Sequence, residues 1–232
     1  MLREFVSADA SGIYDAAAEQ LAEVIESAVA QRGEALIAVS GGKSPEALFQ
    51  RLSKLLLPWS RVRLTLVDER VVPLDHADSN ARLVQTSLLQ GNAAKATWLP
   101  LLRSGLTPEQ MIEVVQDELR QWPLPFDAVV LGMGDDGHTA SWFPDAPELG
   151  ALLSPDNFAL LGIAHPQTAP YTRLTLTRHA VLNSRLIQLL IPGASKQPVY
   201  LRAKQQPEPM VELPVRAVLH QSRVPVHVYR TQ

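Results

Sequence analysis

Three short and largely apolar runs, each followed at once by a polar motif, constrain the fold of this sequence more than any other feature. The runs cover residues 35–39, 62–67 and 127–131. Such runs indicate strands that are buried on both faces, as in parallel sheets covered by helices. Helical patterns alternate with them, so we expect an α/β fold in which helices flank a mainly parallel sheet. No repeat, low-complexity segment or long linker divides the chain, and we expect a single domain, residues 1–232.

Apolar periodicity and capping residues predict the remaining elements. Apolar residues at helical spacing predict a helix from Ile13 to Val29, with Gly33 as its stop. Further helices are predicted from Pro45 to about Leu57, after Asp78 or Ser79 as far as Leu89, from Thr107 onward and after Gly193. Further strands are predicted near residues 158–163, 174–177, 186–191, 215–219 and 226–229.

The composition excludes several classes of function. The chain has no cysteine, which rules out disulfides, thiolate catalysis and cysteine-based zinc sites. Its formal net charge of -3 provides no basic field for a nucleic-acid backbone. No apolar run approaches the roughly 18 residues that span a bilayer, and residues 1–5 lack the apolar core of a secretory signal. We therefore expect a cytoplasmic protein without membrane or nucleic-acid partners; the sequence gives no indication of a protein partner.

The motif after the first run, Ser-Gly-Gly-Lys-Ser at residues 40–44, is typical of an anion site. Paired glycines let backbone N–H groups approach an anion closely, and the start of the next helix adds a favourable dipole. A plain strand-to-helix turn is the alternative. A nucleotide P-loop is excluded, because Ile37 stands where the first glycine of that motif belongs. A small phosphate monoester is the better fit.

Charged residues beside other apolar runs are candidate ligands of the same molecule. Asp68 and Arg70 directly follow the second run. Arg70 is suited to a phosphate or a sugar carboxylate, and Asp68 to hydroxyl groups or a cation. Arg173 precedes an apolar strand and Lys196 opens a helix, which makes each a further candidate phosphate ligand. Solvated surface charges are the alternative for these residues.

The motif after the third run, Gly-Met-Gly-Asp-Asp-Gly-His at residues 132–138, is the most informative. It matches the glycine pattern of dinucleotide-binding loops, but its two carboxylates would repel a pyrophosphate. Pro144 and Pro147 also cut short the helix that should follow. The turn instead brings Asp136 and His138 to one wall, where the carboxylate fixes the tautomer of the imidazole. This pair suits general-base activation of water.

A metal or cofactor site is not expected. The sequence has no H-x-x-x-H motif and no cluster of His and Asp that would supply three ligands at metal spacing. The other histidines lie in polar loops or beside apolar runs, where packing is the better interpretation for each of them.

Together, these motifs resemble those of the 6-phosphogluconolactonase family. The matching segments follow the family's order over nearly the whole chain: residues 40–45, 67–70, 79–80, 132–144, 173–177 and 193–196. Glucosamine-6-phosphate deaminases/isomerases of the same superfamily resemble the chain at the same places. In that group a tyrosine commonly replaces Arg70, and the segment after the histidine often ends in Asn-Glu-Pro rather than Trp142-Phe143-Pro144. Both differences favour the lactonase.

The resemblance implies a modified Rossmann-like, three-layer fold and the hydrolysis of 6-phospho-D-glucono-1,5-lactone to 6-phosphogluconate in the pentose phosphate pathway, without a metal. It implies His138 as the catalytic base and Asp136 as its partner. The candidate substrate-binding residues are Ser40, Gly41, Gly42, Asp68, Arg70, Arg173 and Lys196. The alternatives are an amino-sugar phosphate isomerase/deaminase and a non-catalytic sugar-phosphate-binding protein.

Overall fold

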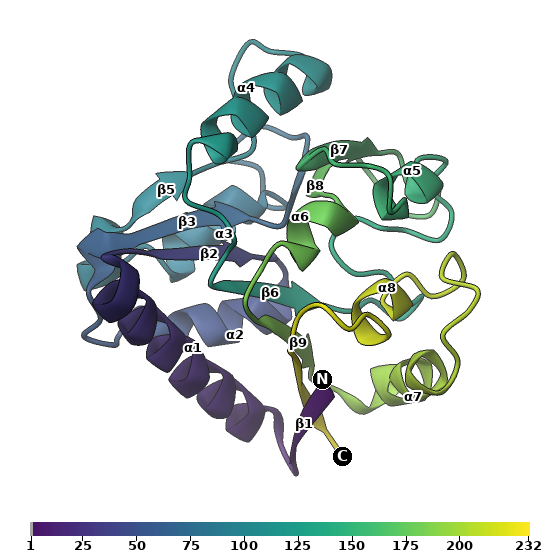
Figure 1. Ribbon diagram of the computed structural model, residues 1–232, viewed down its shortest axis with the longest axis horizontal. Coiled ribbons are helices and arrows are strands. Elements are labelled where there is room, and N and C mark those ends of the chain that lie inside the picture. Colours follow the sequence, from purple (N-terminus) through teal and green to yellow (C-terminus); the bar gives the residue numbers. More distant parts are fainter. Residues whose placement is uncertain (1) are drawn as a thin grey trace.

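A parallel sheet of seven strands forms the centre of the fold (Figure 1). The computed structural model describes residues 2–232, apart from the side chain of Lys43. The strands lie in the order β1 (Leu2–Ser7), β10 (Val226–Thr231), β9 (Ile187–Ile191), β6 (Ala128–Gly132), β2 (Ala35–Val39), β3 (Val62–Leu66) and β5 (Thr97–Leu99). All neighbouring pairs are parallel. The predicted α/β fold with a mainly parallel sheet is confirmed.

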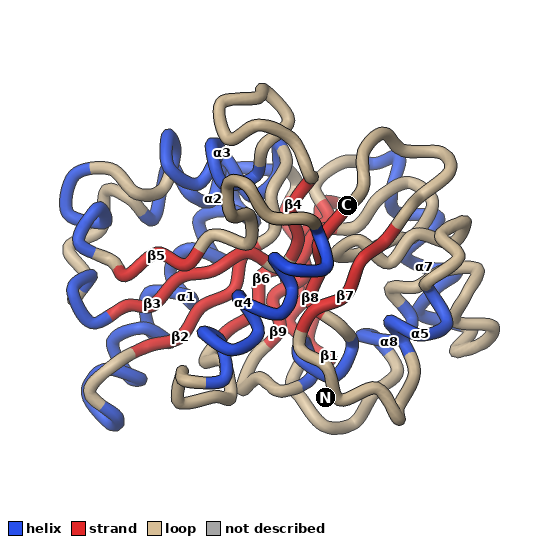
Figure 2. Tube along the Cα trace, turned by 90° about the horizontal axis from the view of Figure 1, so that it is seen from above, coloured by secondary structure: helices blue, strands red, loops and turns tan. Residues whose placement is uncertain are grey.

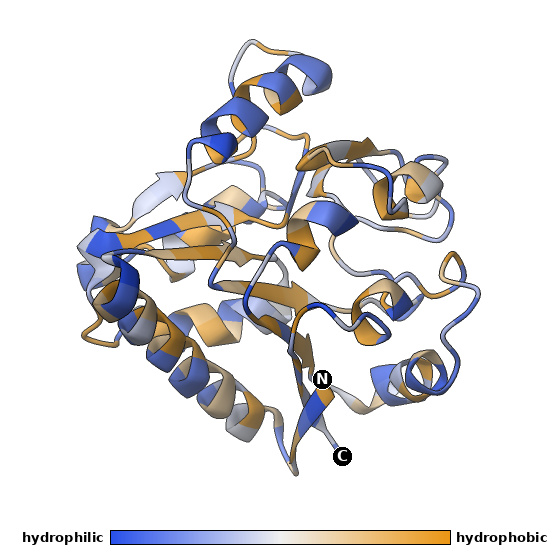
Figure 3. Ribbon diagram, viewed as in Figure 1, coloured by the Kyte–Doolittle hydropathy of each residue, from blue (hydrophilic) through white to orange (hydrophobic). Residues whose placement is uncertain are grey.

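Elements on both faces of this sheet explain why its central strands are apolar. Helices α1 (Ala10–Arg32) and α2 (Lys43–Leu52) cover one face, and α6 (Arg178–Leu182) lies on the other (Figure 1). Every residue of β2 and of β9 is buried as a result. In Figure 3 these strands are orange, whereas α1 alternates between orange and blue because one side of the helix faces solvent. The prediction of buried, two-sided strands is therefore correct.

A second sheet of three antiparallel strands lies next to the large one (Figure 2). Its strands are β4 (Asp68–Arg70), β8 (Arg173–Leu176) and β7 (Leu161–Ala164), in that order. The chain passes from β3 into β4 through the single residue Val67. The N–H of Val67 donates to Val39 of the large sheet, and its carbonyl accepts from Leu176 of the small one. This junction brings Asp68 and Arg70 close to the carboxyl ends of the parallel strands.

The capping residues define most of the helix ends. The side chain of Asp9 caps α1 at its start, and Gly33 ends it with a left-handed φ of 82°. Ser79 caps α3 (Asn80–Ser87), and Thr107 forms a capping box with Gln110 at the start of α4 (Pro108–Arg120). After Gly193, a short 3-10 turn leads into α7 (Gln197–Gln205). None of the helices in the described residues combines the length and apolarity that crossing a membrane requires.

One predicted element is of the wrong type. Residues 215–219 were expected as a strand, but α8 (Arg216–Leu219) is a helix, and the N–H of Leu219 donates to the carbonyl of Val215. A short apolar run does not distinguish a buried strand from a buried helical turn. Helix α2 also ends at Leu52 rather than Leu57; Leu55 and Leu57 still pack against the core, whereas Leu56 is 84% exposed. The prediction missed β1, β5 and the short helices α5 (Leu149–Leu153) and α6.

Candidate active site

A cavity of about 400 Å³ opens where β2 and β6 end and where the small sheet meets the large one. Ligands of open α/β sheets bind at this edge, outside the carboxyl ends of the strands. The wall of the cavity contains His138 and all the candidate substrate-binding residues: Ser40, Gly41, Gly42, Asp68, Arg70, Arg173 and Lys196. Asp136 is not part of the wall but contacts His138. The structure thus brings together every residue that the sequence singles out.

His138 and Asp136 form a closely bonded pair. Nδ1 of the imidazole lies 2.6 Å from Oδ1 of the carboxylate, and the backbone N–H of His138 donates to the same oxygen over 3.1 Å. Because an ionised carboxylate only accepts, Nδ1 carries the proton and Nε2 presents its lone pair. Burial alone would raise the pKa of the Asp136 carboxyl, but the hydrogen bonds and the charge of His138 hold it below its usual value. The pair can therefore accept a proton at Nε2 and stabilise the resulting imidazolium.

Two glycines permit the tight turn that carries this pair. A Cβ on Gly134 would lie 2.2 Å from the His138 ring, so no larger residue fits there without displacing the imidazole. Gly137 has a left-handed φ of 77°, and its carbonyl accepts from the N–H of Val215 over 3.0 Å. Gly134 therefore makes room for the imidazole, and Gly137 supplies the left-handed backbone of the turn. In a dinucleotide-binding loop, by contrast, the glycines let the backbone approach the pyrophosphate of the ligand.

Phe143 lies between the dyad and one of the cavity cations. Its ring stacks on the His138 ring with 4.2 Å between the centroids. The guanidinium of Arg173 lies 5.5 Å from the centroid of the same phenyl ring. Trp142, which precedes it, is fully buried and donates from its indole N–H to the carbonyl of Leu176. The segment after the histidine thus fixes the imidazole by packing, while Asp136 fixes it by hydrogen bonding.

Arg70 and Arg173 form a pair of like charges in the wall. The two residues lie directly opposite each other in the antiparallel pairing of β4 with β8. Each has a buried Nε with no hydrogen-bond partner among the described residues. Burial, together with the charge of Arg70, lowers the pKa of Arg173, and Asp68 partly offsets this effect. Two opposed guanidinium groups, each with an unpaired Nε, make a favourable environment for an anion with several oxygens.

The carboxyl end of β3 and the glycine turn meet around Asn80. Its amide donates to the backbone carbonyl of Asp68 over 2.8 Å, and a Cβ on Gly41 would lie 1.9 Å from its side-chain oxygen. The carboxylate of Asp68 accepts from the hydroxyl of Ser141 over 2.7 Å. Gly41 is therefore required for the close packing of the turn against α3. Lining the cavity, Asp68 is available as an acceptor for substrate hydroxyls.

The glycine turn presents polar groups to the cavity at the start of α2. Gly42 is the N-terminal cap of this helix and has a left-handed φ of 104°, a conformation that favours glycine. The hydroxyl of Ser40 is buried and, in the part of the chain that the structure describes, has no hydrogen-bond partner. The turn therefore combines a helix N-terminus with an unsatisfied hydroxyl, which is an arrangement suited to an anion.

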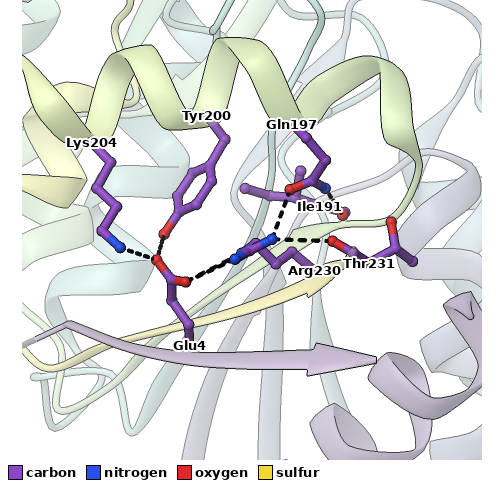
Figure 4. A network of polar contacts seen from close by, with 7 residues as sticks. All are labelled: Glu4, Ile191, Gln197, Tyr200, Lys204, Arg230 and Thr231. Carbon is purple, nitrogen blue, oxygen red and sulfur yellow. Dashed lines mark hydrogen bonds and ion pairs between the residues drawn. The ribbon is translucent and has the colours of Figure 1, made fainter. Parts of the chain in front are cut away.

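Lys196 is positioned at the cavity by its own hydrogen bond to Met133 and by contacts between its neighbour Gln197 and the terminal strands. Its ammonium donates to the carbonyl of Met133 over 2.5 Å, next to the turn that carries the dyad. The following residue, Gln197, accepts from Arg230, which in turn bonds to Glu4 over 3.2 Å. Figure 4 shows that the carboxylate of Glu4 also accepts hydrogen bonds from the hydroxyl of Tyr200 and the ammonium of Lys204. The terminal strands β1 and β10 thereby fix the start of α7 and the position of Lys196.

Comparison with known families identifies the family of the chain. The family model described as glucosamine-6-phosphate isomerases/6-phosphogluconolactonase matches residues 8–227. The chain belongs to this family. The resemblance that the motifs indicate is therefore confirmed.

Relatives within the family carry the lactonase name. A 6-phosphogluconolactonase of Pseudomonas aeruginosa is 44% identical over 213 residues, which cover 91% of this chain and 87% of the relative. One from Neisseria meningitidis is 39% identical over 91% of both chains. The crystal structure of a 6-phosphogluconolactonase from Shewanella baltica superposes with a TM-score of 0.93 at 40% identity and covers 100% of this chain and 97% of its own. A monomeric glucosamine-6-phosphate deaminase, 17% identical with a TM-score of 0.78, shares the fold alone.

The sequence did not indicate every residue that shapes this family site. Phe143 was noted only as part of a motif, although it packs between the imidazole and Arg173. Asn80 follows the helix cap Ser79, and its side chain bonds to the backbone carbonyl of Asp68. Glu69 is completely buried and accepts from the backbone of Asn80. No pattern in the sequence marks these contacts, because each depends on where two distant segments meet.

Proposed function

We propose that this chain hydrolyses 6-phospho-D-glucono-1,5-lactone to 6-phosphogluconate, the reaction of the pentose phosphate pathway for which its relatives are named. One observation carries the proposal. An imidazole with its Nδ1 bonded to a carboxylate lines a cavity that also contains three cationic side chains, Arg70, Arg173 and Lys196. Such a cavity can bind a phosphate at one place and activate water at another. Because the substrate is a charged metabolite, a cytoplasmic location is part of the proposal.

In the proposed mechanism, His138 is the general base. Nε2 takes a proton from a water molecule while the oxygen of that water attacks the lactone carbonyl carbon, C1. A cationic or backbone donor in the cavity wall stabilises the oxyanion of the tetrahedral intermediate. The intermediate then expels the ring oxygen, which receives the proton from the imidazolium, and the C1 carboxylic acid forms. Asp136 holds the imidazole in the required tautomer and stabilises its positive charge during both steps.

The cationic residues and the glycine turn are proposed to bind the phosphate. Arginine side chains bond phosphate oxygens through paired N–H groups, and the buried Nε atoms of Arg70 and Arg173 have no other partner among the residues described. Lys196 and the N-terminus of α2 add positive potential. Asp68 is proposed to accept a hydrogen bond from a sugar hydroxyl, since it lines the same cavity and its carboxylate can accept further bonds besides that from Ser141.

The residues that distinguish the lactonases from the deaminases support the lactonase. Arg70 lines the cavity where a tyrosine is common in the deaminases. Phe143 supports the imidazole directly. Loss of ammonia from glucosamine 6-phosphate is the reaction of the first alternative. Binding of 6-phosphogluconate without lactone turnover above the spontaneous rate would indicate the second, a non-catalytic binding protein.

A lactonase assay on the purified chain tests the proposal. The lactone is supplied fresh, the spontaneous hydrolysis is subtracted, and parallel reactions contain a metal chelator. We expect enzymatic turnover that the chelator leaves unchanged, because the proposed steps use only protein side chains and no cluster of three or more potential metal-binding residues occurs within residues 2–232. Ammonia release from glucosamine 6-phosphate, or loss of turnover with the chelator, would contradict the proposal.

A further inference from the structure

The two arginines in the cavity wall are each bonded to a different surface loop. Nη1 of Arg70 donates to the backbone carbonyl of Asp78 over 2.6 Å, in the loop of residues 73–79. Nη2 of Arg173 donates to the carbonyl of Pro170 over 3.0 Å, in the loop of residues 165–172. Each bond occupies one end of a guanidinium and leaves Nε unpaired. The direction in which each guanidinium points therefore depends on the position of one loop.

Side-chain contacts of Tyr171 join these two loops. The hydroxyl of Tyr171 donates to the carboxylate of Asp78 over 3.1 Å, and the ring of His76 meets the Tyr171 ring edge-on with 5.6 Å between the centroids. Asp78 itself supplies the carbonyl that Arg70 bonds, and Tyr171 directly follows Pro170, whose carbonyl Arg173 bonds. The bridge thus closes a ring of contacts that runs from one arginine through both loops to the other.

The backbone at Tyr171 indicates that this bridge has a function. Tyr171 has a φ of 71°, a left-handed conformation that is unfavourable for any residue with a Cβ. Its side chain is 39% exposed, so the packing of the core does not impose this conformation. The hydrogen bond to Asp78 raises the pKa of the phenol, which remains a donor at neutral pH. Strained residues of this kind are concentrated at functional sites.

We propose that Tyr171 and Asp78 are positioning residues for substrate binding: their bridge fixes the separation of the two loops and thereby holds Arg70 and Arg173 side by side for the phosphate. The need for such a bridge follows from electrostatics. Two guanidinium groups on opposed strand positions repel each other, and without support they would move apart before the anion arrives. A preformed pair binds its anion without that cost of ordering. The inference rests on the proposed function, because it assumes a phosphorylated ligand.

The variant Tyr171→Phe tests the bridge, since it removes one hydroxyl and keeps the ring against His76. We expect the KM for the lactone to rise by about threefold to tenfold, the range that corresponds to the loss of one ordinary hydrogen bond, with kcat unchanged. Asp78→Ala, which retains the backbone carbonyl that Arg70 bonds, should have the same effect. The dissociation constant of 6-phosphogluconate, measured by calorimetry, should rise by the same factor in both variants.

Two further measurements separate positioning from general stabilisation. In a background of Arg70→Met, Tyr171→Phe should change 6-phosphogluconate binding by less than about twofold, because the residue acts through the arginine pair. His165→Asn alters the same loop at its other end and should leave both KM and kcat unchanged. Equal effects of Tyr171→Phe with and without Arg70, an equal fall in kcat, or no effect on binding would overturn the inference.

The calorimetric measurements keep this inference separate from the proposed function. A wild-type chain without lactone turnover refutes the hydrolase. Weaker 6-phosphogluconate binding in Tyr171→Phe would still support the positioning role in that case. Unchanged binding in a chain that does turn over the lactone refutes the positioning role alone.

Discussion

Two histidine–carboxylate pairs in this chain have nearly the same geometry but very different surroundings. Nδ1 of His138 lies 2.6 Å from Asp136, and Nδ1 of His165 lies 2.7 Å from Glu148. In both pairs the carboxylate also accepts from the backbone N–H of the histidine, over 3.1 Å and 3.0 Å. In both, burial alone would raise the pKa of the carboxyl. The hydrogen bonds and the charge of the histidine outweigh this effect, so the net pKa lies below the usual value. By distance and pKa alone, the two pairs are equivalent.

The surroundings distinguish the pairs. The His138 ring lines the cavity, packs against Phe143 and is 29% exposed, whereas the His165 side chain is 54% exposed and is absent from the wall of the cavity. Arginines and a glycine turn lie around the first pair; the second pair ties one surface loop to the residue before α5. A carboxylate on an imidazole is therefore a local structural motif. It becomes a catalytic group only where a ligand cavity meets the free ring nitrogen.

Replacing the two histidines should produce the largest contrast. We expect His138→Asn to lower kcat for lactone hydrolysis by about 10²–10⁴-fold, the usual contribution of a general base. His165→Asn should leave kcat within twofold of wild type, as its ring does not line the proposed active-site cavity. Steady-state assays with the spontaneous rate subtracted measure both, and calorimetric binding of 6-phosphogluconate shows whether the site of His138→Asn is intact. Equal losses in the two variants would break the comparison.

Replacing the carboxylates should have a smaller effect. In Asp136→Asn the amide oxygen can still accept from Nδ1, but the charge that stabilises the imidazolium is lost, and we expect kcat to fall by about 10²-fold. Phe143 still packs on the imidazole, which is why the loss should be less than that of the base itself. Glu148→Gln is the matched control and should retain wild-type kcat. A drop in Glu148→Gln as large as in Asp136→Asn would show that the two pairs are coupled.

A glycine substitution should affect the dyad without changing either of its members. In Gly134→Ala the new methyl would lie 2.2 Å from the imidazole, so the ring must move, and we expect kcat to fall by about tenfold to 10²-fold because small misplacements of a catalytic group are costly. Gly150→Ala in α5 is the control, since nothing lies within 4 Å of its Cβ position. Wild-type kcat in Gly134→Ala would mean that the imidazole need not occupy the position observed here.

The sequence predicts the first of the two pairs but not the second. Asp136 and His138 are two residues apart on a glycine-rich turn after a buried strand, and this local pattern is readable without coordinates. His165 and Glu148 lie 17 positions apart in the sequence, with α5 and β7 between them, and only the folded structure brings them together. The cavity is predicted in part: its glycine turn and charged residues lie beside apolar runs, but Phe143 acquires its position through tertiary packing.

The fold shows the same division between local and distant information. Strands β2 and β6 are buried on both faces, and their continuous apolar character predicts them correctly. Strand β1 contains Arg3 and Glu4 and lies at the edge of the sheet, so its residues show no such pattern. Residues 215–219 are as apolar as a buried strand, but they form a helical turn. An apolar run in the sequence indicates that a segment is buried. Whether that segment forms a strand or a helix depends on the segments that pack against it.

The smallest expected effect concerns stability, and here the two pairs should behave alike. The pKa values of Asp136 and Glu148 are lower in the folded chain than their ordinary unfolded values of about 4, so each ionised carboxylate stabilises the fold above that pH. This contribution is lost as the pH falls through the folded pKa. The carboxylate side chains are 41% and 32% exposed, and solvent screening limits each contribution to about 1 kcal/mol or less.

Urea unfolding between pH 7 and pH 3 tests this similarity. Asp136→Asn and Glu148→Gln should each lose a similar, small amount of stability at pH 7, and each should show a slightly weaker decline than wild type below about pH 4. Stability would then fail to distinguish the pairs, whereas kcat separates them by about 10²-fold for the same substitutions. A much larger loss of stability in Asp136→Asn would instead mean that its effect on kcat comes from unfolding of the turn, and the contrast in activity would no longer identify the catalytic pair.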